Sequence, residues 1–260
     1  MQMSVHQFIS LIDTHAKLSL RADASRYYFG YIWWLLEPLL YVLVFYLVFE
    51  IVLDSGKSDF LAFLMCGKLA FVWFSKSVTQ ASNSIVDNAG LIGMINIPKS
   101  IFPLAVLQQG IYRQLAVFTL LIAFLWLSGY SVSLEWLYLI PVIVVNYLVI
   151  AACALIGASL VCIVRDVSLI ISLGMIFMLF TSGVFWDVRA LDNAEMTHTI
   201  LLLNPLAFLI DSYRQIFMFQ KSPDLAHLFV LGLCAACAVA IAIGLMRRYS
   251  QALALRALCA

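Results

Sequence analysis

Charged side chains are scarce in this 260-residue chain, at 11% of residues against about 25% in a typical soluble domain. No stretch is hydrophilic enough to form a separate soluble domain. Hydrophobic residues make up 64% of the chain, and the mean hydropathy is +1.02. A soluble fold of this size does not need so much apolar surface. We therefore predict an all-α polytopic membrane protein that forms a single transmembrane domain over residues 1–260.

Catalytic and nucleotide-binding signatures are also missing. The sequence has no HExxH or GxSxG motif and no constellation of paired carboxylates. Residues 55–58 (SGKS) resemble the end of a phosphate-binding loop, but that motif needs a glycine where Ile51 stands. We expect no catalytic residue, no metal and no cofactor in this chain. The formal net charge of +1 argues neither for nor against nucleic acid, and we expect no nucleic-acid partner.

Small apolar residues predict close helix packing. Cys234 and Cys237 form a CxxC, which we interpret as a packing face within an apolar helix, and we expect no disulfides. Small residues at four-residue spacing permit helices to approach closely in a membrane. Two such stripes occur in the sequence: Ala154-Ala158-Cys162 and Ala236-Ala240-Gly244.

Long apolar runs predict the membrane topology. A spanning helix needs about 20 apolar residues. Residues 4–22 are amphipathic and too polar to span, which predicts a helix in the membrane interface. Lys and Arg are more frequent on the side that holds the N-terminal flank and the C-terminal tail, so we predict that both termini are cytoplasmic. Six segments qualify as spans, at about 31–53, 60–81, 103–128, 134–164, 167–186 and 225–246.

The segment 187–224 is apolar in places but too short to cross a membrane. We predict two short helices there, at about 189–201 and 205–219, that dip partway into the outer leaflet; an amphipathic pair lying on the surface is the alternative. Asp211 and Arg214 are one helical turn apart, so we expect them to pair.

Three cations fall within predicted spans, where charge is costly. Lys76 and Arg113 lie close enough to the cytoplasmic side to reach the headgroups. Lys68 lies nearer the middle of its span, and two interpretations stay open: a residue that meets an anionic substrate group, or an ordinary structural cation. Glu37 is a candidate partner for Lys68.

An aromatic cluster occupies the start of the first predicted span. Residues 27–34 (YYFGYIWW) contain six aromatic side chains, followed by Glu37 and Pro38. Trp and Tyr favour the membrane–water interface because a ring and a polar tip are both satisfied there. The cluster therefore marks the point where the chain enters the bilayer.

A series of short motifs follows in order over nearly the whole length of the chain: 29–39 (FGYIWWLLEPL), 88–92 (NAGLI), Pro98-Lys99, Arg165-Asp166, 182–185 (SGVF), Asn204-Pro205 and Arg214. In these motifs the chain resembles the membrane subunits of bacterial ABC exporters for surface polysaccharides, the permeases for O-antigen, capsule and teichoic acid. The chain departs from the family pattern in residues 67–73 (GKLAFVW), where a proline is missing and Lys68 is unusual.

The resemblance implies a homodimer in the bacterial inner membrane that works with two copies of a separate ABC ATPase, which would bind the ATP and Mg. It implies a lipid-linked glycan substrate on an undecaprenyl carrier. Residues 83–99 would form a coupling helix on the ATPase, and 187–224 would form the helices of a periplasmic gate.

The resemblance and the chemistry of the side chains together predict three sets of site residues. Aromatic rings suit a conduit for a sliding sugar chain because they bind weakly at many places. The predicted conduit residues are Tyr27, Tyr28, Tyr31, Trp33, Trp34, Lys68, Phe177, Phe180, Phe185 and Trp186. The predicted coupling residues are Asn88, Leu91, Ile92, Pro98 and Lys99. The predicted gate residues are Asn204, Pro205, Asp211 and Arg214.

Two other functions fit the sequence less well. An ABC permease of the same fold for drugs or small lipids has the same composition. A membrane enzyme acting on lipid-linked sugars needs convergent acids or histidines at one depth, and the sequence offers none.

Overall fold

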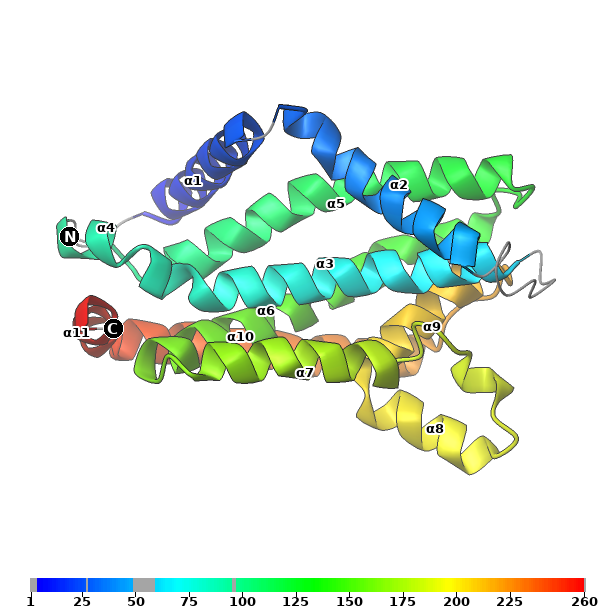
Figure 1. Ribbon diagram of the computed structural model, residues 1–260. Helices are drawn as coiled ribbons and strands as arrows, with labels where there is room; N and C mark the ends of the chain where they lie inside the picture. Colours follow the sequence, from blue (N-terminus) through cyan, green and yellow to red (C-terminus); the bar gives the residue numbers. More distant parts are fainter. Residues whose placement is uncertain (1–3, 27, 49–58, 95–96, 260) are drawn as a thin grey trace.

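The structure is a computed structural model that describes residues 4–26, 28–48, 59–94 and 97–259. Within these residues every regular element is a helix (Figure 1). In chain order the elements are α1 (Val5–Arg26), η1 (Gly30–Ile32), α2 (Trp33–Tyr46), α3 (Phe60–Asp87), α4 (Ala89–Met94), α5 (Ile101–Leu127), η3 (Leu134–Tyr138), α6 (Leu139–Ile163), α7 (Val167–Thr181), η4 (Val188–Ala190), α8 (Ala194–Leu203), α9 (Pro205–Phe217), α10 (Leu225–Arg248) and α11 (Ser250–Cys259).

Four stretches of helix in the described part of the chain are long and apolar enough to cross a membrane: α3, α5, η3 with α6, and α10. They match the second, third, fourth and sixth predicted spans to within a few residues, except that α3 continues to Asp87. The shorter apolar helix α7 covers most of the fifth prediction and ends at Thr181. Helix α2 covers 33–46 of the first, and the end of that prediction, 49–53, lies outside the described residues.

Helix α3 is the centre of the fold. It runs through the middle of the molecule and contacts α5, α6, α7 and α9 (Figure 1). Its buried side chains, such as Leu69 and Phe74, join one large apolar cluster with residues of α5, α6 and α9. The backbones of α3 and α6 approach closely at Gly157, where an added Cβ would lie 2.2 Å from the Ser82 Oγ.

The two predicted small-residue stripes have different outcomes. The three residues of the α6 stripe are buried, as predicted. On α10, however, Ala240 and Gly244 are exposed. Helix α10 instead packs on α6 through Gly232 and Ala235, and a Cβ on Gly232 would lie 3.0 Å from the Val145 Cγ2. The stripe predicted on α10 is therefore the wrong face for packing within the chain.

Helix α1 lies against α5 and is tied to it by polar contacts. It contains the amphipathic segment 4–22 and continues to Arg26. Tyr112 donates a hydrogen bond to Asp13, Gln109 donates to Asp23 at 2.7 Å, and Arg113 forms an ion pair with Asp23. The acidic residues of α1 thus compensate the polar groups of α5.

The sequence predicts no helix beyond 225–246, whereas Ser250–Cys259 of the C-terminal tail forms α11. It packs on α4 and α6, with Leu253 and Ala257 buried beside Ile92 of α4. The Cys162 thiol of α6 donates a hydrogen bond to the Leu253 carbonyl at 3.1 Å. Helices α4 and α11 lie together at the end of the molecule opposite α8 (Figure 1).

The close approach of α3 and α6 gives a test of the packing. We expect Gly157→Val to destabilise the protein by about 1–3 kcal/mol, because the added methyl groups overpack a tight interface. Gly174→Val on α7 is the matched control, since nothing lies within 4 Å of its position. Thermal unfolding in detergent measures both. Equal melting temperatures for the two variants would contradict the packing described here.

Candidate functional site

Helix α9 begins at a well-formed cap. The Asn204 Oδ1 accepts hydrogen bonds from the backbone N–H groups of Leu206 and Ala207, both at 3.1 Å, which satisfies donors that the helix leaves free. Pro205 follows in the first turn, where its missing N–H costs nothing. The Asn204 Nδ2 also donates to the Ser182 Oγ at 3.1 Å. Asn204-Pro205 therefore starts α9 and joins it to the end of α7.

Arg214 fixes the middle of α9 to two other parts of the chain. Its side chain is 2% exposed. It donates hydrogen bonds to the carbonyls of Gly183 at 2.7 Å, Val184 at 2.9 Å and Phe63 at 3.2 Å. Its guanidinium also lies over the Phe63 ring, 3.4 Å from the ring centre. One planar cation therefore joins α9, the turn after α7 and the first turn of α3.

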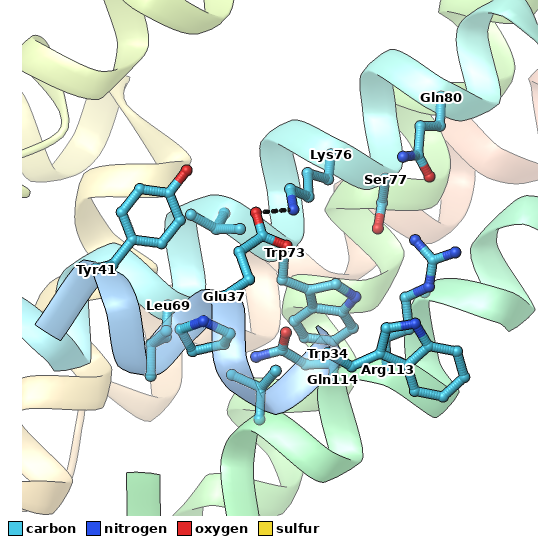
Figure 2. A pocket seen from close by; sticks show the side chains of 14 residues that line it. Trp34, Glu37, Tyr41, Leu69, Trp73, Lys76, Ser77, Gln80, Arg113 and Gln114 are labelled. Atoms are coloured by element: carbon cyan, nitrogen blue, oxygen red, sulfur yellow. Dashed lines mark hydrogen bonds and ion pairs between the residues drawn. The ribbon is translucent and has the colours of Figure 1, made fainter. Parts of the chain in front are cut away.

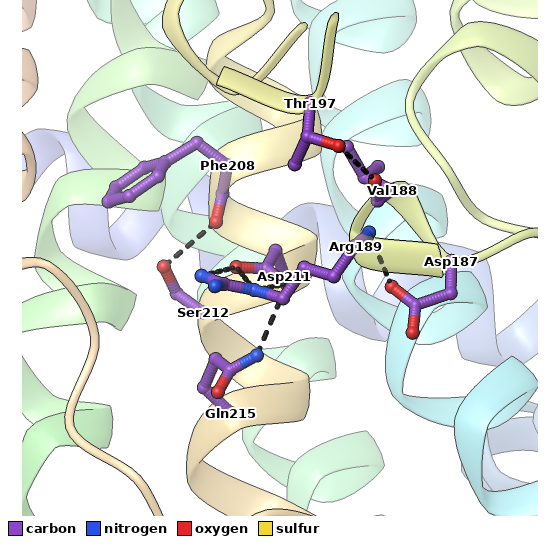
Figure 3. Close-up of polar contacts among 8 residues, drawn as sticks. All are labelled: Asp187, Val188, Arg189, Thr197, Phe208, Asp211, Ser212 and Gln215. Atoms are coloured by element: carbon purple, nitrogen blue, oxygen red, sulfur yellow. Dashed lines mark hydrogen bonds and ion pairs between the residues drawn. The ribbon is translucent and has the colours of Figure 1, made fainter. Parts of the chain in front are cut away.

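The predicted pairing of Asp211 with Arg214 is wrong. Asp211 instead forms a bidentate ion pair with Arg189 of η4, with contacts of 2.7 to 3.0 Å (Figure 3). This pair raises the pKa of the Arg189 guanidinium, chiefly through the hydrogen bond to Asp211. Gln215 also donates to Asp211, at 3.4 Å, and Thr197 of α8 donates to the Val188 carbonyl at 3.0 Å. These contacts attach η4 and α8 to α9.

Gly67 of α3 makes room for the Arg214 guanidinium. An added Cβ there would lie 2.5 Å from the Arg214 Nη2 and 3.3 Å from the Ile210 Cγ2. Gly67, in the segment 67–73 where the chain departs from the family pattern, therefore has a steric role next to α9. Nothing in its own sequence context identifies the side chain that it accommodates.

An aromatic hollow lies beside these contacts. It has a volume of about 820 Å³ and opens at the end of the molecule where α3 begins. Burial raises the pKa of Tyr130 to about 12, so its phenol stays protonated and donates a hydrogen bond to the Asp59 carboxylate at 3.0 Å. Two acids and six aromatic rings are among the lining residues: Asp59, Phe60, Phe63, Tyr130, Phe185, Trp186, Asp187, Ala190, Met218 and Phe219.

The predicted aromatic residues at the end of α7 lie near this hollow. Phe185 and Trp186 line it, and the Trp186 Nε1 donates to the Phe180 carbonyl at 2.8 Å. The rings of Phe180 and Phe185 lie 5.8 Å apart. Phe177 and Phe180 are 67% and 60% exposed on the outer face of α7. The structure therefore brings the rings of Phe180, Phe185 and Trp186 together. Phe177 lies on α7, about one turn before Phe180.

The aromatic residues at the start of α2 form a separate group. Tyr27 lies outside the described residues. Tyr28 is fully exposed, and Tyr31 packs edge-on against Trp34 with ring centres 4.9 Å apart. Arg113 lies over the Trp34 ring, and Trp33 is half-buried. This group is not part of the hollow beside α9.

Lys68 is half-buried and has no Glu37 partner. Its ammonium lies 5.4 Å from the centre of the Tyr41 ring and 5.9 Å from that of Phe71. Glu37 instead forms an ion pair with Lys76, so the pairing suggested by the sequence is wrong. Attraction between the ammonium and the ring faces partly compensates Lys68 for its loss of water.

The predicted coupling residues lie in and around α4. Among the described residues of the segment 83–99, α3 continues to Asp87 and Ala89–Met94 forms the separate helix α4. Leu91 and Met94 are exposed, whereas Ile92 is buried against α11 and α6.

The remaining coupling residues have structural contacts. The Asn88 Nδ2 donates to the Ser84 carbonyl at 2.8 Å, at the end of α3. Pro98 is half-buried. Lys99 is 4% exposed, and burial lowers the pKa of its ammonium. Among the predicted coupling residues, Leu91 is therefore the one with an exposed apolar side chain.

The fold and these contacts define a multi-pass helical membrane protein. Three short elements, η4, α8 and α9, lie between its apolar helices α7 and α10. Residues 21–218 match the ABC-2 type transporter family. This match covers well over half of the chain, and the protein belongs to that family of transport proteins. The resemblance inferred from the sequence motifs is confirmed.

Curated relatives are similar over most of the chain. An O-antigen export system permease protein RfbA of Klebsiella pneumoniae is 30% identical over 210 residues, which is 80% of this chain and 79% of the relative. A protein of the same name from Myxococcus xanthus is 26% identical, with 87% of each chain covered. The polysialic acid transport protein KpsM of Escherichia coli is 24% identical, with 76% of this chain and 78% of the relative covered.

Several residues of the site were not found from the sequence. Arg189, Gly67 and Phe63 surround Asp211 and Arg214 but come from distant segments, and the sequence has no periodicity that links them. Helical spacing favoured the neighbour Arg214 as the partner of Asp211. For the hollow, the available signal was the number of aromatic residues near the ends of the predicted spans, and Asp59 did not carry it.

Arg214 offers a direct test of how α9 is held. Arg214→Lys keeps the charge but cannot supply the planar fork, so buried carbonyls lose their donors. We expect a loss of about 1.5–3 kcal/mol in stability, by thermal unfolding in detergent. Arg247→Lys, on the exposed last turn of α10, is the control and is expected to be neutral. If Arg214→Lys unfolds at the wild-type temperature, the side chain does not hold α9.

Proposed function

We propose that this chain is the transmembrane subunit of an ATP-driven exporter that moves a lipid-linked polysaccharide, of O-antigen or capsule type, out of the bacterial cytoplasm. The observation that carries the proposal is the similarity, over about four fifths of the chain, to permeases named for O-antigen export. The relative named for polysialic acid transport widens the substrate class to acidic capsule glycans.

The proposed architecture is a homodimer of six-span subunits in the inner membrane, with both termini cytoplasmic. Helices α2, α3, α5, α6, α7 and α10 are the six spans; α3, α5, α6, α7 and α10 run roughly along the long axis of the molecule, and α2 crosses it obliquely (Figure 1). The end with α4 and α11 then faces the cytoplasm, and α8 with α9 forms a re-entrant periplasmic pair. Two copies of a separate ATPase bind the ATP and Mg and contact α4.

Aromatic side chains support a glycan substrate. In the proposed dimer, the exposed rings of Phe177 and Phe180 face the conduit, and the hollow beside α9 lies at its periplasmic exit. Rings offer apolar faces to the C–H groups of sugars, and Asp59 and Asp187 offer acceptors to hydroxyl groups. Many weak contacts of this kind let a long chain slide. The carrier we propose is an undecaprenyl lipid that enters beside the aromatic residues of α2.

Coupling to the ATPase is tested at α4. We expect Leu91→Asp to abolish the stimulation of partner ATPase activity while leaving the fold intact, because Leu91 is an exposed side chain of α4. Ile92→Asp is the contrasting variant: it places a charge in the buried cluster with α11, so we expect lower stability. ATPase activity of the reconstituted complex and thermal unfolding separate the two effects. Full stimulation in Leu91→Asp would contradict a coupling role for this residue.

The conduit is tested on α7. We expect the double variant Phe177→Ala, Phe180→Ala to lower glycan export at least tenfold with an unchanged melting temperature, because both rings are largely exposed. Leu169→Ala, equally exposed near the other end of α7, is the control. ATP-dependent glycan uptake into inverted vesicles measures export. Wild-type export in the double variant would show that these rings do not contact the cargo.

An ABC permease for drugs or small lipids is the alternative with the same fold. If the alternative is right, a drug or small lipid stimulates ATP hydrolysis by the complex and a lipid-linked glycan does not. The exposed phenylalanines and the size of the hollow favour the glycan.

A further inference from the structure

A small cavity lies between α2, α3 and α5, apart from the aromatic hollow beside α9 (Figure 2). Its volume is about 80 Å³. Aromatic, charged and amide side chains share its wall. The lining residues include Trp34, Glu37, Tyr41, Trp73, Lys76, Arg113 and Gln114.

Two hydrogen-bond donors at this cavity are buried and unused. The Gln114 side chain is 6% exposed, and its Nε2 has no acceptor among the described residues. The Nε of the adjacent Arg113 likewise lacks an acceptor in the described part of the chain. Buried donors in folded proteins nearly always have a partner. Figure 2 shows the Gln114 amide within the ring of lining side chains, so a ligand in the cavity would supply the missing acceptor.

The charges around the cavity favour an anionic acceptor. Lys76 and Glu37 form an ion pair on one wall (Figure 2), and Arg113 adds a second cation. Asp23 of α1 pairs with the Nη2 of Arg113, but Asp23 is not one of the lining residues. The lining side chains therefore carry two cations and one anion. An ammonium, a guanidinium and an amide N–H together match the oxygens of a phosphate group.

The size of the cavity distinguishes a phosphate from a sugar. One water needs about 10–15 Å³ of such volume, so this cavity holds roughly six atoms of that size. A phosphate group has five non-hydrogen atoms and fits. A hexose has about twice as many non-hydrogen atoms as the cavity can hold. Because the three helices are proposed membrane spans, a lipid is the phosphate carrier that reaches the cavity from the side.

We propose that this cavity binds the phosphate group of a membrane lipid, with Lys76, Arg113 and Gln114 as its donors. The inference rests on the proposed function only in taking α2, α3 and α5 to be membrane helices. Two sources supply the same chemistry: a phospholipid headgroup, and the phosphate of an isoprenoid carrier. The rings of Trp34, Trp73 and Tyr41 would pack against the apolar part of either lipid next to its phosphate.

Native mass spectrometry of the purified full-length chain, delipidated in detergent, tests the proposal. The probes are phosphatidylglycerol, phosphatidylethanolamine, undecaprenyl phosphate and, as the phosphate-free match, diacylglycerol. We expect one equivalent of a phosphate-bearing lipid to be retained and none of the diacylglycerol. Preference for undecaprenyl phosphate would identify the carrier as the ligand, and preference for a phospholipid would identify a bound structural lipid. Equal retention of diacylglycerol would overturn the proposal.

Variants separate binding from folding. We expect Gln114→Leu and Lys76→Gln each to lower lipid retention at least tenfold. Gln114→Leu removes an unused buried donor, so its lipid-free melting temperature should not fall. Lys221→Gln is the control, because Lys221 is an exposed cation that does not line the cavity. Unchanged retention in Gln114→Leu, or an equal loss in Lys221→Gln, would overturn the site. ATP-driven glycan export by a chain that retains no phosphate lipid would overturn the site and leave the proposed function standing.

Discussion

The buried guanidinium of Arg214 is the interaction on which the arrangement around α9 depends. A buried charge is costly unless its hydrogen-bonding groups are used, and Arg214 uses its donors on carbonyls from two distant segments. Gly67 is small because the guanidinium fills the space beside it. Helix α9, the turn after α7 and the start of α3 are therefore joined at one point. A movement of α9 during transport must either break these bonds or carry the other two segments with it.

The same constraint explains the other charges of the chain. An apolar surrounding makes unpaired charges expensive, and two ion pairs link separate helices: Glu37 of α2 with Lys76 of α3, and Asp23 of α1 with Arg113 of α5. Asp211 is held by Arg189 in a similar way. Few charges are present, and these three ion pairs position one element against another. The scarcity of charge in the sequence and the pairing of these charges have the same physical cause, which is the free-energy cost of an unpaired charge in an apolar surrounding.

Some of this could be predicted from the sequence. Long apolar runs identified α3, α5, α6 and α10, because hydrophobicity over about 20 residues determines a spanning helix without reference to its neighbours. The start of α9 was also predictable, since Asn204-Pro205 acts locally. Partners could not be predicted: Asp211 had a cation one turn away in its own helix, yet a residue from another segment binds it. Whether a small-residue face packs within the chain, as on α6 but not α10, likewise depends on the neighbouring helices.

The two ends of the molecule differ in how they are held together. The end with α4 and α11 is joined by apolar contacts around Ile92 and Leu253, with one thiol hydrogen bond from Cys162. The end with α8 and α9 is joined by the polar contacts of Arg189 and Arg214. In the proposed exporter the first end receives work from the ATPase and the second releases the glycan. Rigid apolar packing suits the first, and exchangeable hydrogen bonds suit the second.

Translocation in a defined system tests the central claim most directly. The chain is reconstituted with its ATPase in inverted vesicles, and uptake of a labelled lipid-linked glycan is followed with ATP, with a non-hydrolysable analogue, and with a proton gradient alone. The account predicts uptake with ATP only. Uptake driven by the proton gradient without ATP would contradict it.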